Sequence, residues 1–414
     1  DTINAGVGID NIDGGDGDDQ FNVTTITDFV GLAAAETVIG GAGNDTLTLS
    51  QTATAITLVA NDLLGLSGVD RIILDGTSAA GSITLTDAVY SANGVSNLKI
   101  IDGTLTDGTL TVNAGSLTGT NAVTVTANTT TAKDDTLTGG AGDDTFILAT
   151  TAGLEATDTV VGGAGTDTIS LTATAAVTAV LTGVRTVEKV ITTGNGGNVV
   201  ITVGSDSVLA ASTSLITDAS SVSNGTNTLN YDGSAISTST KTQSVTGTAG
   251  NDSIVGGAGN DTIIGGDGAD SITAGAGIDN VLGGNGDDIF VVATTGTGFV
   301  NLATPDTLDG GAGNDTLEIT AGTITLNATD LLGLKGVEVI QVKNTTQAAS
   351  ISLTDAVFTA DGLTALTINA STVTTTNGLT VQASGLSAAN SLTVNISNTG
   401  NTAGNVINLG AGND

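Results

Sequence analysis

The sequence predicts an all-β chain in which short strands wind into a solenoid, with only a few short helices. Three observations lead to this expectation. A nine-residue pattern recurs in three glycine-rich blocks, and the longer segments between the blocks are themselves repeated. The chain also contains 60 glycines, 1 proline and only 2% aromatic residues. Tight glycine turns and a core of Val, Ile, Leu and Ala suit stacked β layers.

The nine-residue pattern reads Gly-Gly-x-Gly-x-Asp-x-U-x, where U is a large apolar residue. It is clearest from Gly247 to Val291, where five consecutive repeats carry an aspartate at the sixth position. Iteration at a fixed period predicts a repeat architecture. The sixth-position acids are Asp1, Asp10, Asp19, Glu36 and Asp45 in the first block, Asp135, Asp144, Asp158 and Asp167 in the second, Asp252, Asp261, Asp270, Asp279, Asp288, Asp306 and Asp315 in the third, and Asp414 at the start of a further one.

This iterated pattern resembles the RTX (repeats-in-toxin) family of secreted proteins. The resemblance implies a parallel β-roll that binds calcium between glycine turns. It also implies that two nonapeptides make one coil, so that each turn stacks on the turn two repeats later. Secretion to the bacterial cell surface, by a type I route, is part of the same expectation.

Calcium is the cation that the residues favour. It takes six to eight oxygen ligands from carboxylates and carbonyls, and glycine turns can aim carbonyl oxygens inward while the sixth-position acid adds an anionic arm. We therefore expect all of the sixth-position acids to be ligands, and about ten Ca²⁺ ions to bind between stacked turns. The fifth-position residues, such as Asp18 and Asn44, are expected to face solvent.

Each block is interrupted once. The repeat stops after Phe21, Phe146 and Phe290 and resumes at an acid followed by threonine, after breaks of different length. Loops vary in length more readily than coils of fixed geometry. We therefore expect the breaks to be loops, with stacking continued across them. The predicted stacked pairs are Asp1–Asp19, Asp10–Glu36, Asp19–Asp45, Asp135–Asp158, Asp144–Asp167, Asp252–Asp270, Asp261–Asp279, Asp270–Asp288, Asp279–Asp306 and Asp288–Asp315.

The segments between the blocks, which we call spacers, repeat as well. Residues 56–74 match residues 324–342 at a constant offset of 268, and the middle spacer is a weaker copy. Alternating strands are predicted at 56–58, 72–74, 83–85, 98–100, 110–112 and 123–125. Residues 62–66 and 87–92 are expected to form short helices with Asp62 and Asp87 as N-caps and Gly94 near the end of the second. The predicted organisation is calcium blocks at 1–50, 133–170 and 243–320, solenoid spacers at 51–132, 171–242 and 321–408, and the start of a further block at 409–414.

The charge and the missing residue types exclude several functions. Eight basic residues against 42 acidic ones give a net charge of 8 − 42 = −34. Nucleic-acid binding is therefore not expected, and divalent cations are the obvious neutralising partners. No apolar run is long enough to insert into a membrane. No signal peptide is visible, and the sequence begins and ends within repeats, so we expect it to be a piece of a longer protein whose targeting signals lie outside it.

An enzyme is not expected, because a chain without histidine can build neither a His-Glu-x-x-His zinc site nor a Ser-His-Asp triad. A lyase- or epimerase-like enzyme would also need a basic or tyrosine-lined cleft, and Arg71, Arg185, Tyr90 and Tyr231 are scattered. An ice-binding solenoid is a further alternative because Thr-x-Thr is frequent, although its spacing is irregular.

The leading hypothesis is an S-layer subunit that self-associates and contacts cell-surface polysaccharide. The runner-up is the stalk of a large adhesin.

Overall fold

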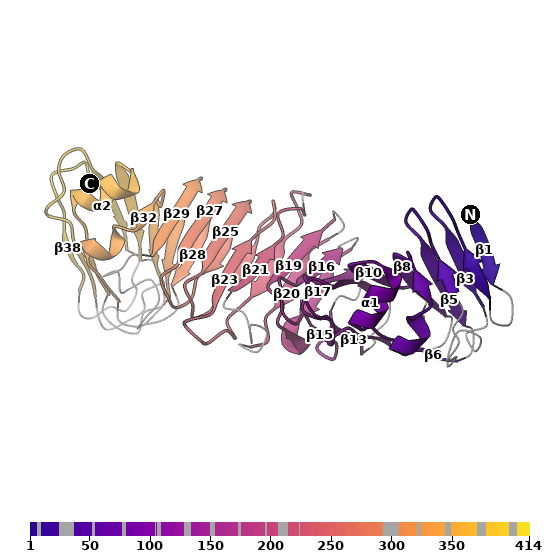
Figure 1. The fold of residues 1–414 in the computed structure, drawn as a ribbon. Coiled ribbons are helices and arrows are strands. Elements are labelled where there is room, and N and C mark those ends of the chain that lie inside the picture. The colour runs from indigo at the N-terminus through magenta and orange to yellow at the C-terminus, as the bar shows by residue number, and fades with distance from the viewer. Residues whose placement is uncertain are drawn as a thin grey trace. The chain divides into compact units, whose positions relative to one another are not determined.

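A computed structural model describes residues 1–5, 10–24, 37–51, 54–76, 80–103, 105, 109–127, 134–149, 154–172, 175–194, 197–205, 214–222, 224–292, 306–320, 324–343, 349–370, 378–396 and 404–414. The chain divides into two compact units, Asp1–Leu215 and Ile216–Asp414, and each is described by itself. In both units short parallel strands lie side by side (Figure 1).

The first unit is a stack of coils whose strands form extended parallel sheets. The longest sheet contains, in order, β1 (Thr2–Ala5), β3 (Gln20–Val23), β5 (Thr46–Gln51), β8 (Arg71–Gly76), β10 (Asn97–Asp102), β12 (Ala122–Ala127), β14 (Thr145–Ala149), β16 (Thr168–Thr172) and β19 (Lys189–Thr193). A second sheet contains β6 (Ile56–Leu58), β9 (Gly81–Thr84), β11 (Leu110–Asn113), β13 (Thr136–Thr138), β15 (Thr159–Val161) and β18 (Val184–Arg185). Two smaller sets are β2 (Asn11–Asp13), β4 (Thr37–Ile39) and β7 (Leu66–Ser67), and β17 (Val177–Val180) with β20 (Val199–Thr202).

The second unit is built in the same way. One set of its strands is β23 (Thr242–Thr246), β25 (Thr262–Asp267), β27 (Asn280–Asn285), β29 (Thr307–Ala312) and β32 (Leu334–Lys335). A second set is β22 (Leu229–Asp232), β24 (Ser253–Val255), β26 (Ser271–Thr273), β28 (Ile289–Val292), β30 (Thr316–Ile319), β33 (Val339–Val342), β35 (Ala365–Asn369) and β37 (Ser391–Asn395). A third is β31 (Ile324–Leu326), β34 (Ala349–Ser352), β36 (Leu379–Gln382) and β38 (Val406–Asn408), while β21 (Ser214–Asp218) contains the boundary between the units.

The core of each coil follows from the two-residue alternation of its strands. The apolar U position of each described repeat points inward, where residues such as Phe21, Phe146 and Ile254 are almost fully buried. Because parallel strands pair in register, each U residue stacks on the one in the next coil, as Phe21 does on Leu47. A column of apolar side chains therefore runs through each unit, and it confirms the predicted all-β solenoid.

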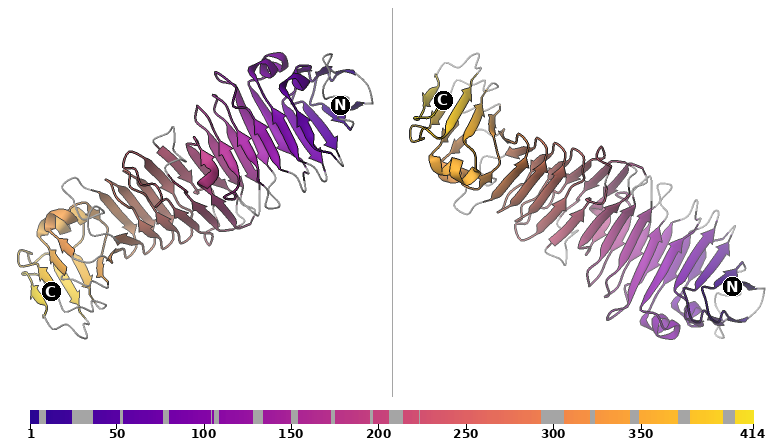
Figure 2. Two further views of the ribbon diagram at one scale, coloured as in Figure 1. Left: turned by 90° about the horizontal axis from the view of Figure 1, so that it is seen from below. Right: turned by 90° about the horizontal axis from the view of Figure 1, so that it is seen from above.

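Among the described residues, helices are few and lie outside the strands of their own unit (Figure 2). They are α1 (Asp87–Asn93) and α2 (Asp355–Asp361), with 3₁₀ turns η2 (Ala60–Leu63), η3 (Leu181–Gly183) and η5 (Ala328–Leu331). None of the helices in the described ranges is long and apolar enough to cross a membrane.

The predicted helix ends need correction. The helix predicted at 62–66 is wrong in its extent, because η2 covers Ala60–Leu63 and Leu66 already belongs to strand β7. The N-cap of α1 is Thr86 and that of η2 is Val59, so Asp87 and Asp62 are not N-caps. Asp62 lies instead within the first turn, where its carboxylate accepts the N–H of Val59 at 2.9 Å. The helix dipole stabilises an acid in the first turn as well as at the N-cap, so the presence of aspartate could not distinguish between these two positions. Gly94 does end α1, in the left-handed conformation with φ of 79°.

Candidate metal sites between stacked turns

The sixth-position acids of stacked turns are joined by hydrogen bonds. The backbone N–H of each acid donates to Oδ1 of the acid in the next coil, and we call this chain of contacts the acid ladder. Its rungs are Asp19 to Asp45 (2.9 Å), Asp135 to Asp158 (2.9 Å), Asp144 to Asp167 (2.8 Å), Asp252 to Asp270 (2.7 Å), Asp261 to Asp279 (2.8 Å), Asp270 to Asp288 (2.8 Å), Asp279 to Asp306 (2.8 Å) and Asp288 to Asp315 (2.8 Å).

The ladder crosses the interruptions as predicted. Asp279 bonds to Asp306 and Asp288 to Asp315, each across 27 residues, whereas Asp252 and Asp270 are only 18 apart. Inserted residues therefore do not shift the stacking order. The residues of the breaks at 25–36, 150–153 and 293–305 lie outside the described ranges, and with them Glu36, so the Asp10–Glu36 pair stays a prediction.

The sixth-position acids near the two ends of the chain, Asp1, Asp10 and Asp414, are more exposed than the ladder acids between them. The N-terminal amine of Asp1 donates to Oδ1 of Asp19 at 2.5 Å, which places Asp1 against the predicted partner. Asp10 is half-buried, and its carbonyl oxygen accepts the N–H of Thr37. Asp414 is exposed, and its Oδ1 accepts the N–H of Leu392 at 2.9 Å. Oδ1 of Asp144, one of the first two acids of the second block, accepts the N–H of Val123 in the same way. Asp414 therefore occupies the position of an acid at the start of a block.

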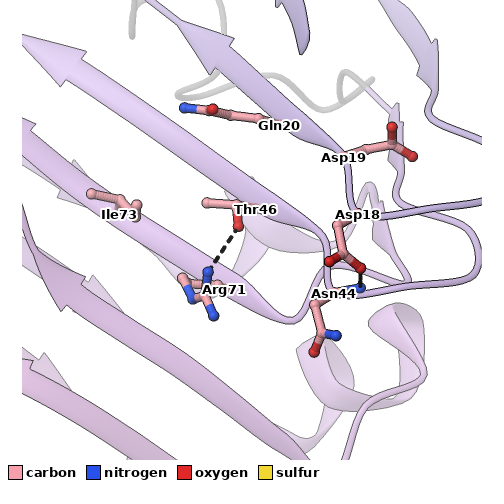
Figure 3. Close-up of a pocket in the computed structure, with 7 residues that line it drawn as sticks. All are labelled: Asp18, Asp19, Gln20, Asn44, Thr46, Arg71 and Ile73. Carbon is pink, nitrogen blue, oxygen red and sulfur yellow. Dashed lines mark hydrogen bonds between the residues drawn. The ribbon is translucent and has the colours of Figure 1, made fainter. Parts of the chain in front are cut away.

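The fifth-position residues face solvent, as predicted, but they form a second ladder that the sequence did not indicate. Oδ1 of Asp18 accepts the N–H of Asn44 in the next coil at 2.8 Å (Figure 3). The same contact joins Asn251 to Ala269 and Asp287 to Asn314. Short polar side chains at this position thus cross-link coils from the outer side of each turn.

Burial changes the electrostatics of the inner carboxylates. Asp144, Asp167, Asp270, Asp288 and Asp315 expose 1% or less of their surface. Loss of hydration is the largest cause that raises their pKa values, and neighbouring acids add to it for all of them. The pKa of Asp167 and of Asp270 rises to about 7, and that of Asp288 to about 6. Such groups are costly to hold as anions unless a cation compensates them.

Two oxygen atoms crowd the first glycine of nine of the turns. A Cβ atom built on Gly14 would lie 2.7 Å from the carbonyl oxygen of Gly40 and still closer to Oδ2 of Asp19. Two oxygens therefore converge where a side chain would begin, and we call this arrangement a cradle: Oδ2 of the sixth-position acid together with a carbonyl oxygen of the next coil. Cradles lie at Gly14, Gly40, Gly139, Gly162, Gly247, Gly256, Gly265, Gly283 and Gly310.

The cradles are of two kinds, which differ in how Oδ2 is satisfied. In turns at the start of a block, a backbone N–H donates to this oxygen. The N–H of Gly140 donates to Oδ2 of Asp144 at 2.6 Å, and the N–H of Gly257 donates to Oδ2 of Asp261 at 3.0 Å. In later turns the second glycine is left-handed, for example Gly266 with φ of 126°. There Oδ2 is buried without a hydrogen-bond partner. These oxygens belong to Asp19, Asp45, Asp167, Asp270, Asp288 and Asp315.

Unpartnered buried carboxylate oxygens fit a bound cation. Leaving such an oxygen without a partner costs about 1–3 kcal/mol, and more for a charged group. No three acidic side chains within the described ranges gather into a site of their own. A cation in a cradle would therefore depend on carbonyl oxygens for most of its ligands. Hard oxygen donors and one or two carboxylates suit Ca²⁺.

Three acids outside the repeat pattern complete the ladders and were missed from the sequence. Asp70, Glu188 and Glu338 lie in the first coil of each spacer. Their carboxylates accept the N–H of Asp45 (2.9 Å), Asp167 (2.8 Å) and Asp315 (2.7 Å), respectively. The shared signal is a valine directly before the acid, in Gly68-Val-Asp, Thr186-Val-Glu and Gly336-Val-Glu. No nine-residue pattern surrounds it, so periodicity could not reveal it.

Comparison with known families points to the same turns. The model of the RTX calcium-binding nonapeptide repeat (4 copies) matches residues 1–23, 30–50, 129–149, 152–171, 246–281, 264–292 and 303–322. No curated protein and no solved structure matches the chain. The matched segments contain all the sixth-position acids of the ladder, and the spacers lie largely outside them. The blocks that carry the acid ladders are thus supported as RTX calcium-binding repeats.

Proposed function

We propose that this chain is a calcium-dependent structural module of a secreted bacterial cell-surface protein, and that the protein is an S-layer subunit. The six buried Oδ2 atoms without partners carry the calcium part of this proposal. RTX repeats supply the secreted context, since proteins with such repeats are generally exported by a type I route.

The protein's own residues would act as follows. Sixth-position carboxylates and the glycine carbonyl oxygens of the next coil hold the ion, and a bound Ca²⁺ supplies two positive charges between two stacked turns. Each ladder N–H fixes Oδ1, which leaves Oδ2 directed to the cradle. Sites of this kind add coil-to-coil attraction, and they neutralise part of the charge of −34.

Calcium binding is tested by isothermal titration of the chelated protein with CaCl₂. We expect tight sites in the unpartnered cradles and weaker ones where Oδ2 already accepts an N–H, because a satisfied oxygen gains less from the ion. An absence of heat and of any spectral change at millimolar calcium would contradict the proposal.

The S-layer assignment depends on composition and on the solenoid, which offers repeated edges for lateral contact. Electron microscopy of the calcium-loaded protein distinguishes it from the adhesin-stalk alternative. A planar two-dimensional lattice supports an S-layer subunit, and monomeric rods support a stalk. Binding to purified surface polysaccharide, measured by co-sedimentation, tests the proposed glycan partner separately. The RTX repeat family is typically structural, so catalysis is not proposed.

A further inference from the structure

The first coil of every spacer closes a cradle although it lacks the glycine turn. It consists of a two-residue strand, then a residue in the left-handed region, a buried valine and an acid. The strands are β7, β18 and β32, and the left-handed residues are Gly68 (φ 69°), Thr186 (φ 50°) and Gly336 (φ 63°). Thr186 is the one non-glycine residue with positive φ among those the structure describes. Such a conformation is unfavourable for threonine, so it indicates a local requirement.

That requirement is the position of one carbonyl oxygen. A Cβ atom on Gly40 would collide with the carbonyl oxygen of Gly68 and lie 2.6 Å from Oδ2 of Asp45. The carbonyl oxygen of Thr186 and Oδ2 of Asp167 meet at Gly162 in the same way, as do those of Gly336 and Asp315 at Gly310. The left-handed residue thus places its carbonyl where a glycine carbonyl lies in the interior cradles.

The last ladder acid of each block, like the interior ones, has a buried carboxylate oxygen without a hydrogen-bond partner. Asp45, Asp167 and Asp315 are each 0% exposed, and each has an Oδ2 with no hydrogen-bond partner. Oδ1 of each accepts the N–H of the acid one coil earlier. A ladder that simply ended there would leave three buried carboxylate oxygens uncompensated.

The spacer acid holds this coil in place. Oδ2 of Asp70 accepts the N–H of Asp45, while the N–H groups of Asp70 and Arg71 both donate to the carbonyl oxygen of Asp45 at 3.0 Å. Glu188 and Glu338 repeat the arrangement on Asp167 and Asp315. An amide or hydroxyl could accept the same N–H, yet all three positions carry an acid, which adds negative charge beside each end cradle.

We propose that the last cradle of each of the three blocks is a calcium site shared with the spacer, which supplies a carbonyl ligand from outside the nonapeptide pattern. Its ligands include Oδ2 of Asp45, Asp167 or Asp315 and the carbonyl oxygen of Gly68, Thr186 or Gly336. Asp70, Glu188 and Glu338 are positioning residues, whose charge strengthens the site. The inference rests on the proposed function, because it presumes that the interior cradles bind calcium.

The test compares calcium titrations of the full chain with those of the triple variant Asp70→Asn, Glu188→Gln and Glu338→Gln. The amides retain an oxygen acceptor for the ladder N–H but remove the charge. We expect three sites to weaken by about tenfold or more, since charge-assisted contacts are roughly twice as strong as neutral ones. The remaining sites should keep their affinity.

A matched control removes the same charge elsewhere. Asp218→Asn, Asp232→Asn and Glu318→Gln change three acids that lie outside the ladders, so both triple variants have a net charge of −34 + 3 = −31. The control should bind as many ions as the unmodified chain. Circular dichroism at saturating calcium checks that each protein folds. If the first triple variant does not fold, Glu338→Gln alone is measured, and we expect one site to weaken.

The outcomes separate the two proposals. Weakening of three sites in the first variant but not in the control supports the end sites. Unchanged binding in both variants overturns them and leaves the interior sites standing. Equal weakening in both variants also overturns them, since net charge alone would then be the cause. No calcium binding by the unmodified chain overturns both the end sites and the proposed function.

Discussion

Within each unit the glycine blocks and the spacers both form coils of parallel strands, but different interactions stabilise them. In the third block a coil takes 18 residues and buries ladder acids such as Asp261 and Asp270 beside its apolar column. A coil of the first spacer is longer, with Ile72 stacked on Ile100 across 28 residues. Its buried polar groups are satisfied by protein, since the hydroxyl of Tyr90 donates to Ala122 O at 2.6 Å and Asn93 bonds Val69 in both directions.

This difference indicates where the chain depends on an ion. Coils of the first spacer are longer, and none of their described buried carboxylate oxygens lacks a partner, so we expect their stability to come from the polypeptide. Block coils are short and retain carboxylate oxygens without partners. Their stability should therefore depend on calcium.

Removal of calcium should give the largest effect. With excess EDTA, we expect residues 243–320 to lose strand structure, while spacer residues such as 71–76 and 97–102 stay protected from hydrogen exchange. Ligands that bind only the folded state stabilise it by mass action, so their removal unfolds what depends on them. Exchange measured by mass spectrometry, with and without calcium, resolves the two regions. Equal loss of protection in blocks and spacers would contradict the contrast.

Two aspartates of one ladder should respond differently to substitution. Asp270→Ala removes an unpartnered Oδ2 from a cradle, so we expect the calcium midpoint of the full chain to rise about tenfold. Asp252 already has both oxygens satisfied by Leu229 and Thr248. Asp252→Ala should therefore lower stability by about 1–3 kcal/mol at any calcium concentration, with a smaller midpoint shift. Titration followed by circular dichroism measures both, and identical midpoints would refute the distinction.

Acid should partly replace calcium in the blocks. Burial raises the pKa of Asp167, Asp270 and Asp279 from 3.8 to about 7 in the folded state. The folded form then binds protons more tightly than the unfolded form, so stability is present below about pH 4 and is lost as pH rises toward 7. We expect the calcium-free chain to show more strand signal at pH 5 than at pH 7.5. A signal that increases with pH in EDTA would show the opposite sign.

The smallest effect should come from a change within a spacer. Tyr90→Phe introduces the residue that the equivalent helix α2 carries as Phe358, and removes the hydrogen bond to Ala122. We expect a loss of about 1 kcal/mol that is the same with and without calcium. Thermal unfolding in both conditions checks this. A loss that grew in EDTA would indicate that spacer stability depends on the ions.

The sequence was a reliable guide wherever one residue repeated at a fixed interval. Asp252, Asp261 and Asp270, nine residues apart, predicted both the coil and its register, and the breaks after Phe21 and Phe290 could be recognised from their varied lengths. Glu338 could not be found in this way, because it occurs once per unit and acts through the backbone of Asp315. The two kinds of cradle were also unpredictable, since they depend on the sign of φ at a glycine such as Gly140 or Gly266.

The acid ladder joins acids in successive coils, whatever the number of residues between them in the sequence. The N–H of Asp279 donates to Asp306 although 26 residues lie between them in the sequence. The N–H of Asp261 donates to Asp279 with only 17 residues between. The structure therefore has points at which chain length is free, each placed just before an acid that restores the register. Foreign peptides inserted between Val292 and Asp306 should leave every rung intact. Such insertion points would allow the inserted segments to vary, by evolution or by engineering, while the register of the ladder stays constant.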